Sequence, residues 1–381
     1  MTIIIQEIND REQWNGFVAS QSTGHILQSF EWGELNKYQG RRIHRLGALE
    51  DGRMVGALLL AVTSVPLPVT VPGLRTDWLY GLRGPVVEAP DSPALAALVE
   101  FAHKLARQEH AVILRLEPNI TDDMPDMQRW VAAFHQLGFR DNPHALHPRR
   151  SWALDICPSP EQLLADFKMT WRQNVRIAER KGVTVREAVS DADFDSYYEL
   201  LKITSERDDF LVLSKDYHKE VLRQFASQGH GILYLAEHEG EAVAAKMLLR
   251  YGDWCVDMFG ASSNNKRNLK PTYLLQYRCF LWAKEQGCSF FDFRAIPEIL
   301  EPGEEMWGVY EYKRGFAGYS RLCLPTQDYV YRPLIYRTWR TYVDIRRKRL
   351  DTAHKKAEQE RVARSQSAKE KEKVQSVKEK V

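Results

Sequence analysis

The sequence offers isolated reactive side chains rather than a common catalytic motif. Lys313 lies among Tyr310, Tyr312 and Phe316, and this aromatic setting argues against an ordinary exposed lysine. The chain contains none of the runs G-x-x-x-x-G-K-[ST], H-E-x-x-H, G-x-S-x-G and G-x-G-x-x-G, which are typical of nucleotide hydrolases, zinc proteases, α/β hydrolases and dinucleotide-binding enzymes. We therefore do not expect an enzyme of these classes.

The cysteines and histidines indicate neither a metal site nor a disulfide framework. Five cysteines, an odd number, occur without a C-x-x-C pair, and no Cys/His group has zinc spacing. We expect free thiols in a reducing compartment and no bound metal. His218, His230 and His238 lie on or beside expected helices and strands without partners, and we interpret them as structural.

Composition and charge indicate a soluble globular protein with a basic tail. The 381 residues are 44% hydrophobic and 27% charged, and their number suits two to three domains. Residues 346–381 hold 13 basic and 6 acidic residues, a net charge of +7, and because the whole chain carries +2, residues 1–345 carry −5. An anion site in the body must therefore be a local pocket rather than a general basic surface.

No segment resembles a signal peptide or a membrane span. The start lacks a basic region, and three prolines interrupt the apolar stretch 55–72. We expect a cytoplasmic protein and, since two domains would bury the apolar faces, a monomer. The tail 346–381 is expected to be a solvated helix, frayed or disordered toward its end. A peripheral contact with anionic lipid at the inner face of the membrane, or with RNA, is the alternative.

A weak internal repeat predicts two similarly folded halves. Residues 47–60 and 235–248 each read as a strand, an acidic Gly turn and a second strand, with an offset of 188. Residues 103–118 and 280–295 each read as an amphipathic helix, a break and a β-rich strand, with an offset of 177. We place the junction near residues 141–151, where Asn, Pro and His cluster.

Hydrophobic periodicity and helix boundaries complete the expected elements. Helices are expected at 9–20, 30–38, 92–109, 160–169, 170–181, 191–206, 215–228 and 269–287. Strands are expected at 41–50, 54–62, 183–187, 232–237, 241–251, 253–260 and 290–294. Mixed sheets covered by helices follow, and the fold class is α/β (α+β).

The order helix–helix–strand–hairpin–helix–strand favours two tandem N-acyltransferase (GNAT-like) domains. Such domains usually hold the CoA pyrophosphate on a Gly-rich loop at a helix N-terminus. The corresponding segment 263–270 contains no glycine, and the segment 80–92 of the first half does not supply the pattern either. We therefore expect the acyltransferase fold without CoA.

Six motifs together resemble the FemABX family, the tRNA-dependent aminoacyltransferases that build peptidoglycan interpeptide bridges. The resemblance covers roughly residues 25–335. The matching runs are Gln28-Ser-Phe-Glu-Trp32, Tyr80-Gly-Leu-Arg-Gly-Pro-Val86, Trp171-Arg-Gln-Asn-Val-Arg-Ile-Ala-Glu-Arg-Lys-Gly-Val183, Pro271-Thr-Tyr-Leu-Leu-Gln-Tyr277, Phe291-Asp-Phe-Arg-Ala-Ile296, and Gly308-Val-Tyr-Glu-Tyr-Lys313 with Gly315-Phe-Ala-Gly318.

The resemblance implies a domain division and a reaction. The first domain would span 1–148, with 318–345 packing back on it, the second would span 149–317, and 346–381 would be the tail. The amino acid would arrive as an ester on tRNA. The acceptor would be an amine of the stem peptide on a muramyl-peptide precursor, either UDP-linked or lipid-linked. An ester is already activated, so no cofactor is required, and the enzyme must position the amine and stabilise an oxyanion.

The resemblance also implies roles for single residues. Lys313 would stabilise the tetrahedral intermediate or hold phosphate, and the alternative is a surface lysine at a strand end. Arg207 would contact a diphosphate, or else only balance its acidic neighbours at a helix end. Lys37 would contact substrate, although a shift of one residue would put Asn36 there. Tyr310 and Tyr312 would line the substrate site beside Lys313.

Two further residues are candidates with structural alternatives. Glu117 precedes a proline where the family often has Asp, and it would accept a proton from the attacking ammonium. A plain strand-end carboxylate is the other interpretation. Arg83 would line the cleft or pack in a turn, and Asp292 is interpreted as structural.

The motifs also differ from the family in two places. Arg294-Ala295 replaces a small Gly-Gly pair, and Leu211 stands where some members have an aromatic contact. Both changes point to an altered acceptor. The competing hypotheses are a CoA-dependent N-acetyltransferase, a related tRNA-dependent transferase acting on lipid or protein amines, and a protein that only binds.

Overall fold

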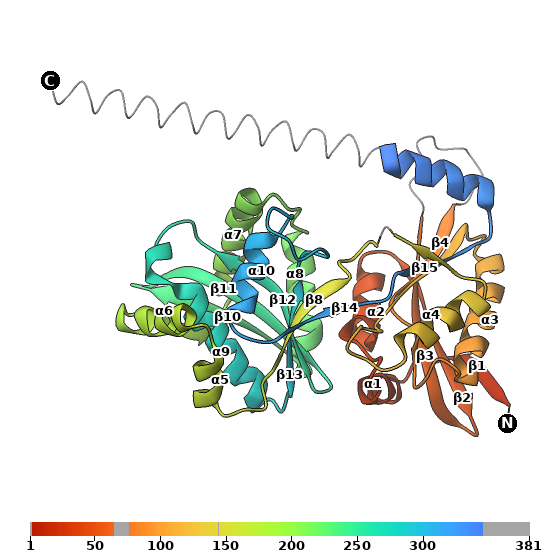
Figure 1. Ribbon diagram of the computed structural model, residues 1–381, viewed down its shortest axis with the longest axis horizontal. Coiled ribbons are helices and arrows are strands. Elements are labelled where there is room, and N and C mark those ends of the chain that lie inside the picture. Colours follow the sequence, from red (N-terminus) through yellow and green to blue (C-terminus); the bar gives the residue numbers. More distant parts are fainter. Residues whose placement is uncertain (1, 65–75, 144, 346–381) are drawn as a thin grey trace.

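The computed structural model describes residues 2–64, 76–143 and 145–345, and it consists of two lobes that lie side by side (Figure 1). The first lobe contains β1 (Ile3–Glu7), α1 (Arg11–Ser20), η1 (Ile26–Gln28), α2 (Phe30–Tyr38), β2 (Arg42–Glu50), β3 (Arg53–Ser64), β4 (Asp77–Arg83), β5 (Val86–Val87), α3 (Pro93–Gln108), β6 (Ile113–Pro118), α4 (Met127–Gln136), β7 (Arg140–Asn142) and β15 (Thr326–Val330). Its sheet has the order β1-β2-β3-β4-β6-β15-β7, and β5 pairs with β3.

The second lobe has the same kind of mixed sheet. It contains β8 (Arg150–Asp155), α5 (Pro160–Asp166), α6 (Met169–Arg180), β9 (Thr184–Glu187), α7 (Asp191–Asp208), α8 (Lys215–Ala226), β10 (Gly231–His238), β11 (Glu241–Tyr251), β12 (Trp254–Ser262), η2 (Arg267–Leu269), α9 (Pro271–Glu285), β13 (Phe290–Ala295), α10 (Trp307–Arg314) and β14 (Tyr319–Leu322). Its sheet has the order β14-β8-β13-β12-β11-β10-β9. The predicted α/β class with two tandem GNAT-like domains is confirmed.

Local sequence signals explain where the main helices begin. Ser29 caps α2, Ser92 caps α3 with Pro93 in its first turn, and Ser190 and Asp193 form a capping box on α7. The helices and strands expected from the sequence are present, with boundaries that differ by a few residues. The elements β1, β4, α4, β7, β8 and α10 had no equivalent in the prediction.

The predicted repeat is visible in the strand register. In the hairpin of β2 and β3, Ala48 pairs with Gly56 and Leu49 with Met54, so that Val55 forms a bulge. In the hairpin of β10 and β11, Val243 forms a bulge in the same way. Val55 and Val243 are 188 residues apart, which is the predicted offset. The offset holds because the two hairpins share the same turn length and the same alternation of side chains.

Apolar side chains join the two lobes. One buried cluster combines residues of the first lobe, such as Trp14 and Leu27, with residues of the second, such as Tyr197 and Phe225. The other large clusters lie within single lobes. This shared buried cluster packs the two lobes against each other.

The segment after α10 is divided between the lobes. Strand β14 pairs with β8 in the second sheet, whereas β15 lies between β6 and β7 in the first. The expectation that all of 318–345 returns to the first domain is therefore wrong for β14. Beyond β15, residues 333–345 are helical, and Trp339 contacts Trp78 at a ring distance of 5.5 Å. The predicted tail 346–381 lies outside the described residues.

A buried ion pair fixes β15 to β6. Arg115 Nε and Nη2 donate to the two oxygens of Asp328, both at 2.7 Å, and both side chains are 2% exposed. Asn142 and Tyr336 donate further hydrogen bonds to Asp328 at 2.8 and 2.7 Å. Such a satisfied bidentate pair specifies where the returning strand inserts. Among the described residues no helix is both long enough and apolar enough to span a membrane.

Candidate active site

The second lobe contains a gap between two parallel strands. β12 and β13 pair at three positions, from Trp254–Phe290 to Val256–Asp292, and then diverge although both strands continue. The equivalent strands of the first lobe, β4 and β6, stay paired over six positions. Within the described residues, these strands of the second lobe, unlike their equivalents in the first, therefore present ends between which a ligand can reach the backbone of the sheet.

Lys313 lies at this gap. Its Nζ donates to the carbonyl oxygens of Phe293 and Ala295, both at 2.7 Å. Lys313 is in the last turn of the helix α10, so the alternative of a surface lysine at a strand end is wrong. Burial lowers the pKa of Lys313 to about 7, and the nearby charge of Lys246 acts in the same direction, whereas Asp257 opposes it.

Lys246 and Asp257 form a buried ion pair beside Lys313. The two residues come from the adjacent strands β11 and β12, and their side chains are 11% and 6% exposed. Sequence reasoning missed this pair. The sequence did contain a signal, because Lys246 interrupts the apolar run Ala242–Leu249 and Asp257 interrupts the apolar run Trp254–Phe259. Charged residues are rarely buried unless they are paired.

The aromatic residues around Lys313 hold its helix in place. Tyr312 donates from its hydroxyl to Thr272 O at 2.9 Å, and its own carbonyl accepts from Trp171 Nε1 at 2.9 Å. Tyr310 is 8% exposed and contacts Trp152 edge to face. The structure thus gives both tyrosines a packing role, and their predicted contact with substrate stays a prediction.

A glycine lets the helix of Lys313 approach its neighbour. A Cβ added to Gly315 would lie 2.3 Å from the Trp171 ring. Gly315 also accepts a hydrogen bond from Lys168 N at 2.9 Å through its carbonyl. The Gly315-Phe motif is therefore explained by close packing of α10 against α6, which sets the position of Lys313.

A cleft of about 490 Å³ opens between the lobes and is lined by charged residues of both. Arg83 lines this cleft and donates to Cys323 Sγ at 2.7 Å and to Pro148 O at 3.0 Å. Its predicted contact with substrate stays a prediction. Arg321 pairs with Asp123 at 3.0 Å and covers the ring of Trp254. Arg294 and Asp292 face the same cleft from β13.

A second cavity of about 320 Å³ adjoins the cleft and shares Leu27 and His147 with it. Asn36 lines this cavity, whereas Lys37 is half exposed and paired with Glu34 at 2.9 Å. In the alternative register noted above, the matching residue is Asn36, and it is Asn36 rather than Lys37 that lines the cavity. Contact of Lys37 with substrate stays a prediction.

Glu117 is held by neighbouring groups at the end of β6. It accepts from Tyr80 and from Leu146 N, both at 2.8 Å, and lies 3.6 Å from His147 Nδ1. Burial alone would raise the pKa of Glu117, but the bonds from His147 and Leu146 hold it below its ordinary value. A carboxylate with these bonds is a weak base. Glu117 positions Tyr80 and His147, which line the second cavity.

Arg207 lies at the end of α7, beside the free end of β12. Its Nη1 donates to Ser262 O and to Asn264 Oδ1, both at 3.1 Å, and its Nε donates to Asp208 at 2.9 Å. The side chain is 23% exposed. The structure thus places Arg207 near the diverging end of the sheet, while its contact with a diphosphate stays a prediction.

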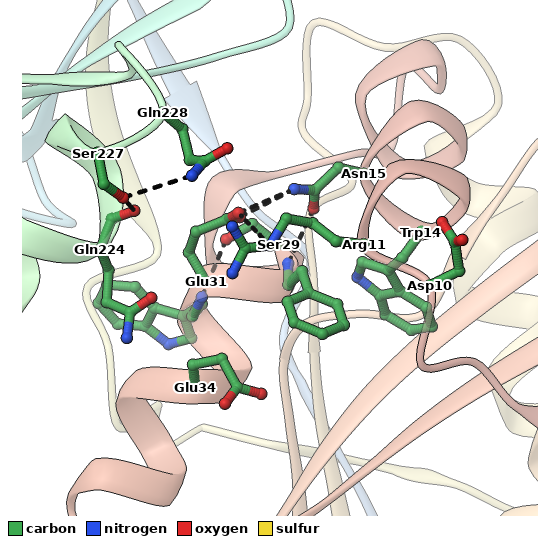
Figure 2. A network of polar contacts seen from close by, with 12 residues as sticks. Asp10, Arg11, Trp14, Asn15, Ser29, Glu31, Glu34, Gln224, Ser227 and Gln228 are labelled. Carbon is green, nitrogen blue, oxygen red and sulfur yellow. Dashed lines mark hydrogen bonds and ion pairs between the residues drawn. The ribbon is translucent and has the colours of Figure 1, made fainter.

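Glu31 of the Gln28–Trp32 motif is buried near the interface between the lobes. Figure 2 shows its carboxylate facing Asn15 and Arg11 of α1, with Gln224 at the nearby end of α8. Asn15 Nδ2 donates to Glu31 at 2.9 Å, and Arg11 lies at 3.5 Å. Tyr251 of the second lobe donates to Asn15 Oδ1 at 3.1 Å. The motif therefore fixes the interface between the lobes.

No group of three or more His, Cys, Asp or Glu residues within 2–64, 76–143 and 145–345 could hold a metal ion. All five cysteines are free thiols, and Cys157 alone is exposed.

Comparison with known proteins identifies similar chains. A profile of the FemAB family matches residues 10–238, and a profile of an acetyltransferase (GNAT) domain matches residues 166–314. The lipid II:glycine glycyltransferase of Staphylococcus aureus (strain USA300) is 24% identical over 399 residues, which cover 85% of this chain and 92% of the relative.

Solved structures share the fold. The crystal structure of FemX superposes with a TM-score of 0.79 at 21% identity, covering 88% of this chain and 99% of FemX. A tandem GNAT protein from the clavulanic acid biosynthesis pathway has a TM-score of 0.53 at 13% identity, covering 86% and 98% of the two chains. The structure of L-PGS from Bacillus licheniformis has a TM-score of 0.51 at 18% identity, covering 85% and 93%.

Proposed function

The chain belongs to the FemAB family, and we propose that it transfers an amino acid from aminoacyl-tRNA to an amine of the stem peptide on a lipid-linked muramyl precursor. The observation that carries the proposal is the placement of Lys313 at the gap between β12 and β13. The relative from Staphylococcus aureus, named as a lipid II:glycine glycyltransferase, supports a lipid-linked acceptor and makes glycine the first donor to test.

The reaction needs a cation and accurate positioning. The acceptor amine attacks the ester carbonyl carbon, and the carbonyl oxygen becomes an oxyanion. The carbon–oxygen bond to the terminal ribose of the tRNA then breaks, and the ribose oxygen takes the proton that the amine releases. Two N–H groups of Lys313 are fixed by the carbonyls of Phe293 and Ala295, which leaves the third free for the oxyanion.

Two features support tRNA rather than CoA as the carrier of the donor. Pro271 occupies the first turn of α9 and has no N–H, and Lys270 before it has a left-handed backbone, so this helix start is poorly suited to a pyrophosphate. The neighbouring surface is basic. Arg176, Arg180 and Lys181 are exposed at α6, and Lys181 donates to Asn268 O in η2 at 3.2 Å. Such a surface suits the phosphates of an RNA.

A transfer assay with purified protein tests the proposal. The protein is mixed with lipid-linked pentapeptide precursor and tRNA charged with radiolabelled glycine, then with a pool of labelled aminoacyl-tRNAs and with the UDP-linked precursor. We expect label on the lipid-linked peptide that is lost with RNase or with Lys313→Met. The matched control is Lys104→Met, which changes an exposed lysine in α3.

The outcomes separate the hypotheses. Label on the UDP-linked precursor alone would keep the chemistry and change the acceptor. An absence of label with every acceptor, together with calorimetric binding of acetyl-CoA, would refute the proposal and favour the N-acetyltransferase.

A further inference from the structure

Two arginines in the cleft have no carboxylate partner. Arg294 Nη1 donates to Met258 O at 3.2 Å and to Met258 Sδ at 2.8 Å, and Arg83 contacts only Cys323 Sγ and Pro148 O. Within residues 2–64, 76–143 and 145–345 neither guanidinium forms an ion pair, unlike Arg321, which pairs with Asp123. Asp292 lies near enough to act on both arginines by its charge, but it forms an ion pair with neither. Partly buried guanidinium groups without a direct ion pair can bind an anionic ligand.

The backbone at both arginines has a left-handed conformation. Arg83 has φ of 58° and Arg294 has φ of 62°, values that residues with a Cβ rarely adopt. At Arg294 the conformation suits the glycine of the small pair that the related motif carries. This chain has an arginine in place of that glycine, and the arginine side chain faces the cleft. An unfavourable backbone that aims a charged group into a cavity points to a binding role.

His25 adds a neutral hydrogen-bond donor to the same cleft. Its Nδ1 accepts from Leu27 N at 3.0 Å, so the proton is on Nε2. Burial holds the pKa of His25 well below its usual range, and the charges of Arg83, Arg294 and Arg321 act in the same direction. The imidazole therefore stays neutral and can donate to an anion beside the two arginines.

The charges of the cleft indicate which kind of anion fits. Its lining contains three arginines, at 83, 294 and 321, and three aspartates, at 123, 253 and 292. An RNA backbone or a diphosphate would require a clear excess of positive charge. Asp292 is 9% exposed, and its Oδ1 accepts from Arg294 N at 2.6 Å. Carboxylate and guanidinium groups thus line the same cleft, as a ligand with both charges requires.

Resting on the proposed function, we infer that the cleft selects an acceptor amine that stands next to a free carboxylate. Arg83 and Arg294 bind the carboxylate, and Asp292 accepts a hydrogen bond from the neighbouring amine. The position suits the reaction, because Phe293 and Ala295, whose carbonyls hold Lys313, flank Arg294 in β13. The acceptor class is therefore a diamino acid whose side chain ends in an amine and a carboxylate, rather than a plain alkylamine.

Three acceptors test the inference. They are precursors with meso-diaminopimelate at the third position, with the same residue amidated at its distal carboxylate, and with L-lysine. We expect the KM for the first to be about 10- to 100-fold lower than for the other two, the range given by charge-assisted hydrogen bonds. The same order is expected for calorimetric binding of the three stem peptides without donor.

Arg294→Gly is the informative variant, because glycine accepts a φ of 62° and the protein should fold. It should raise the KM for the diaminopimelate acceptor to that of the amidated one, so that the preference between the two acceptors is lost. Arg129→Ala, at an exposed site on α4, is the matched control and should change neither value.

Equal KM values for all three acceptors with the parent enzyme would overturn the inference, as would an equal loss for all three in Arg294→Gly. Failure of the proposed function is distinguishable. In that case no acceptor is labelled, while the calorimetric preference and its loss in Arg294→Gly persist. Labelling without any preference would instead retain the function and refute the carboxylate site.

Discussion

The charge state of Lys313 gives the sharpest test of the mechanism. Because burial lowers the pKa of Lys313 to about 7, the ammonium is lost as the pH rises through 7. If the ammonium stabilises the oxyanion, kcat for transfer must fall on the alkaline side, with a midpoint near pH 7. If Lys313 acted instead as a base, kcat would rise as the pH increases through 7.

The buried ion pair allows the midpoint to be moved in both directions. Asp257 favours the charged form of Lys313 and Lys246 disfavours it. Asp257→Asn should therefore move the midpoint down by about one pH unit, and Lys246→Gln should move it up by about as much. The double variant Asp257→Asn/Lys246→Gln removes both charges and is the matched control, with a midpoint near that of the parent.

The assay measures kcat between pH 5.5 and 9 with saturating acceptor and charged tRNA. Breaking a buried pair costs about 3–5 kcal/mol. Thermal unfolding is therefore measured for each variant to check that it is folded. A midpoint that is the same in all variants would refute the role of Lys313. A rate that rises through pH 7 would show that Lys313 acts as a base.

Stability supplies an independent readout of the same pKa. The unfolded chain keeps Lys313 protonated up to about pH 10.4, whereas the folded chain loses the proton near pH 7. Between these values the unfolded state binds more protons, so this residue makes the free energy of unfolding rise with pH from about 7 to about 10. Lys313→Met should remove this part of the slope in urea titrations, and an unchanged slope would contradict the low pKa.

Three further predictions concern the framework and are measured by urea unfolding. Asp328→Ala should lower the free energy of unfolding by about 3–5 kcal/mol, because it leaves the buried Arg115 guanidinium unpaired; a loss below 1 kcal/mol would show that the pair is dispensable. Gly315→Ala should cost about 2 kcal/mol or more and lower kcat, because the added methyl group meets Trp171, whereas Gly308→Ala in the same helix meets nothing within 4 Å and should be neutral or stabilising. Equal effects in the two glycine variants would refute the packing argument. Glu31→Ala should cost about 1–3 kcal/mol, because it removes the hydrogen bonds that hold Asn15, the residue contacted by Tyr251 of the second lobe; an unchanged free energy of unfolding would show that these bonds do not contribute to stability.

Local signals explain why most of the fold was predictable. The hairpins around residues 51 and 239 follow from alternation and an acidic Gly turn, and serines at positions 29, 92 and 190 begin three helices. The repeat offset of 188 could be read because both hairpins keep the same turn and bulge. These features depend only on neighbours in the sequence.

The parts that escaped prediction depend on contacts between distant residues. Arg115 and Asp328 are 213 residues apart, and Arg83 and Cys323 are 240 apart. The residue types did not indicate these pairs, because a single charged residue in a predicted strand is usually interpreted as a surface residue. The helix α10 was missed because it has only eight residues and is rich in aromatic side chains. Lys313 was recognised through a motif, whereas its hydrogen bonds to the carbonyls of β13 follow only from the fold.

The difference between the two lobes has a cause in β13. In β13 one extra residue lies between Asp292 and Ala295 relative to β8, and within this bulge Arg294 has a φ of 62° while Asp292 accepts its N–H. The strand therefore turns away from β12 after three pairs. At the offset of 177 the first lobe has Glu117, which stays in a regular strand paired with β4. The left-handed residue thus opens the gap that Lys313 occupies, and the same residue supplies a guanidinium to the cleft. A substitution at Arg294 that keeps the φ but removes the charge separates these two roles, because the gap should remain while the acceptor preference is lost.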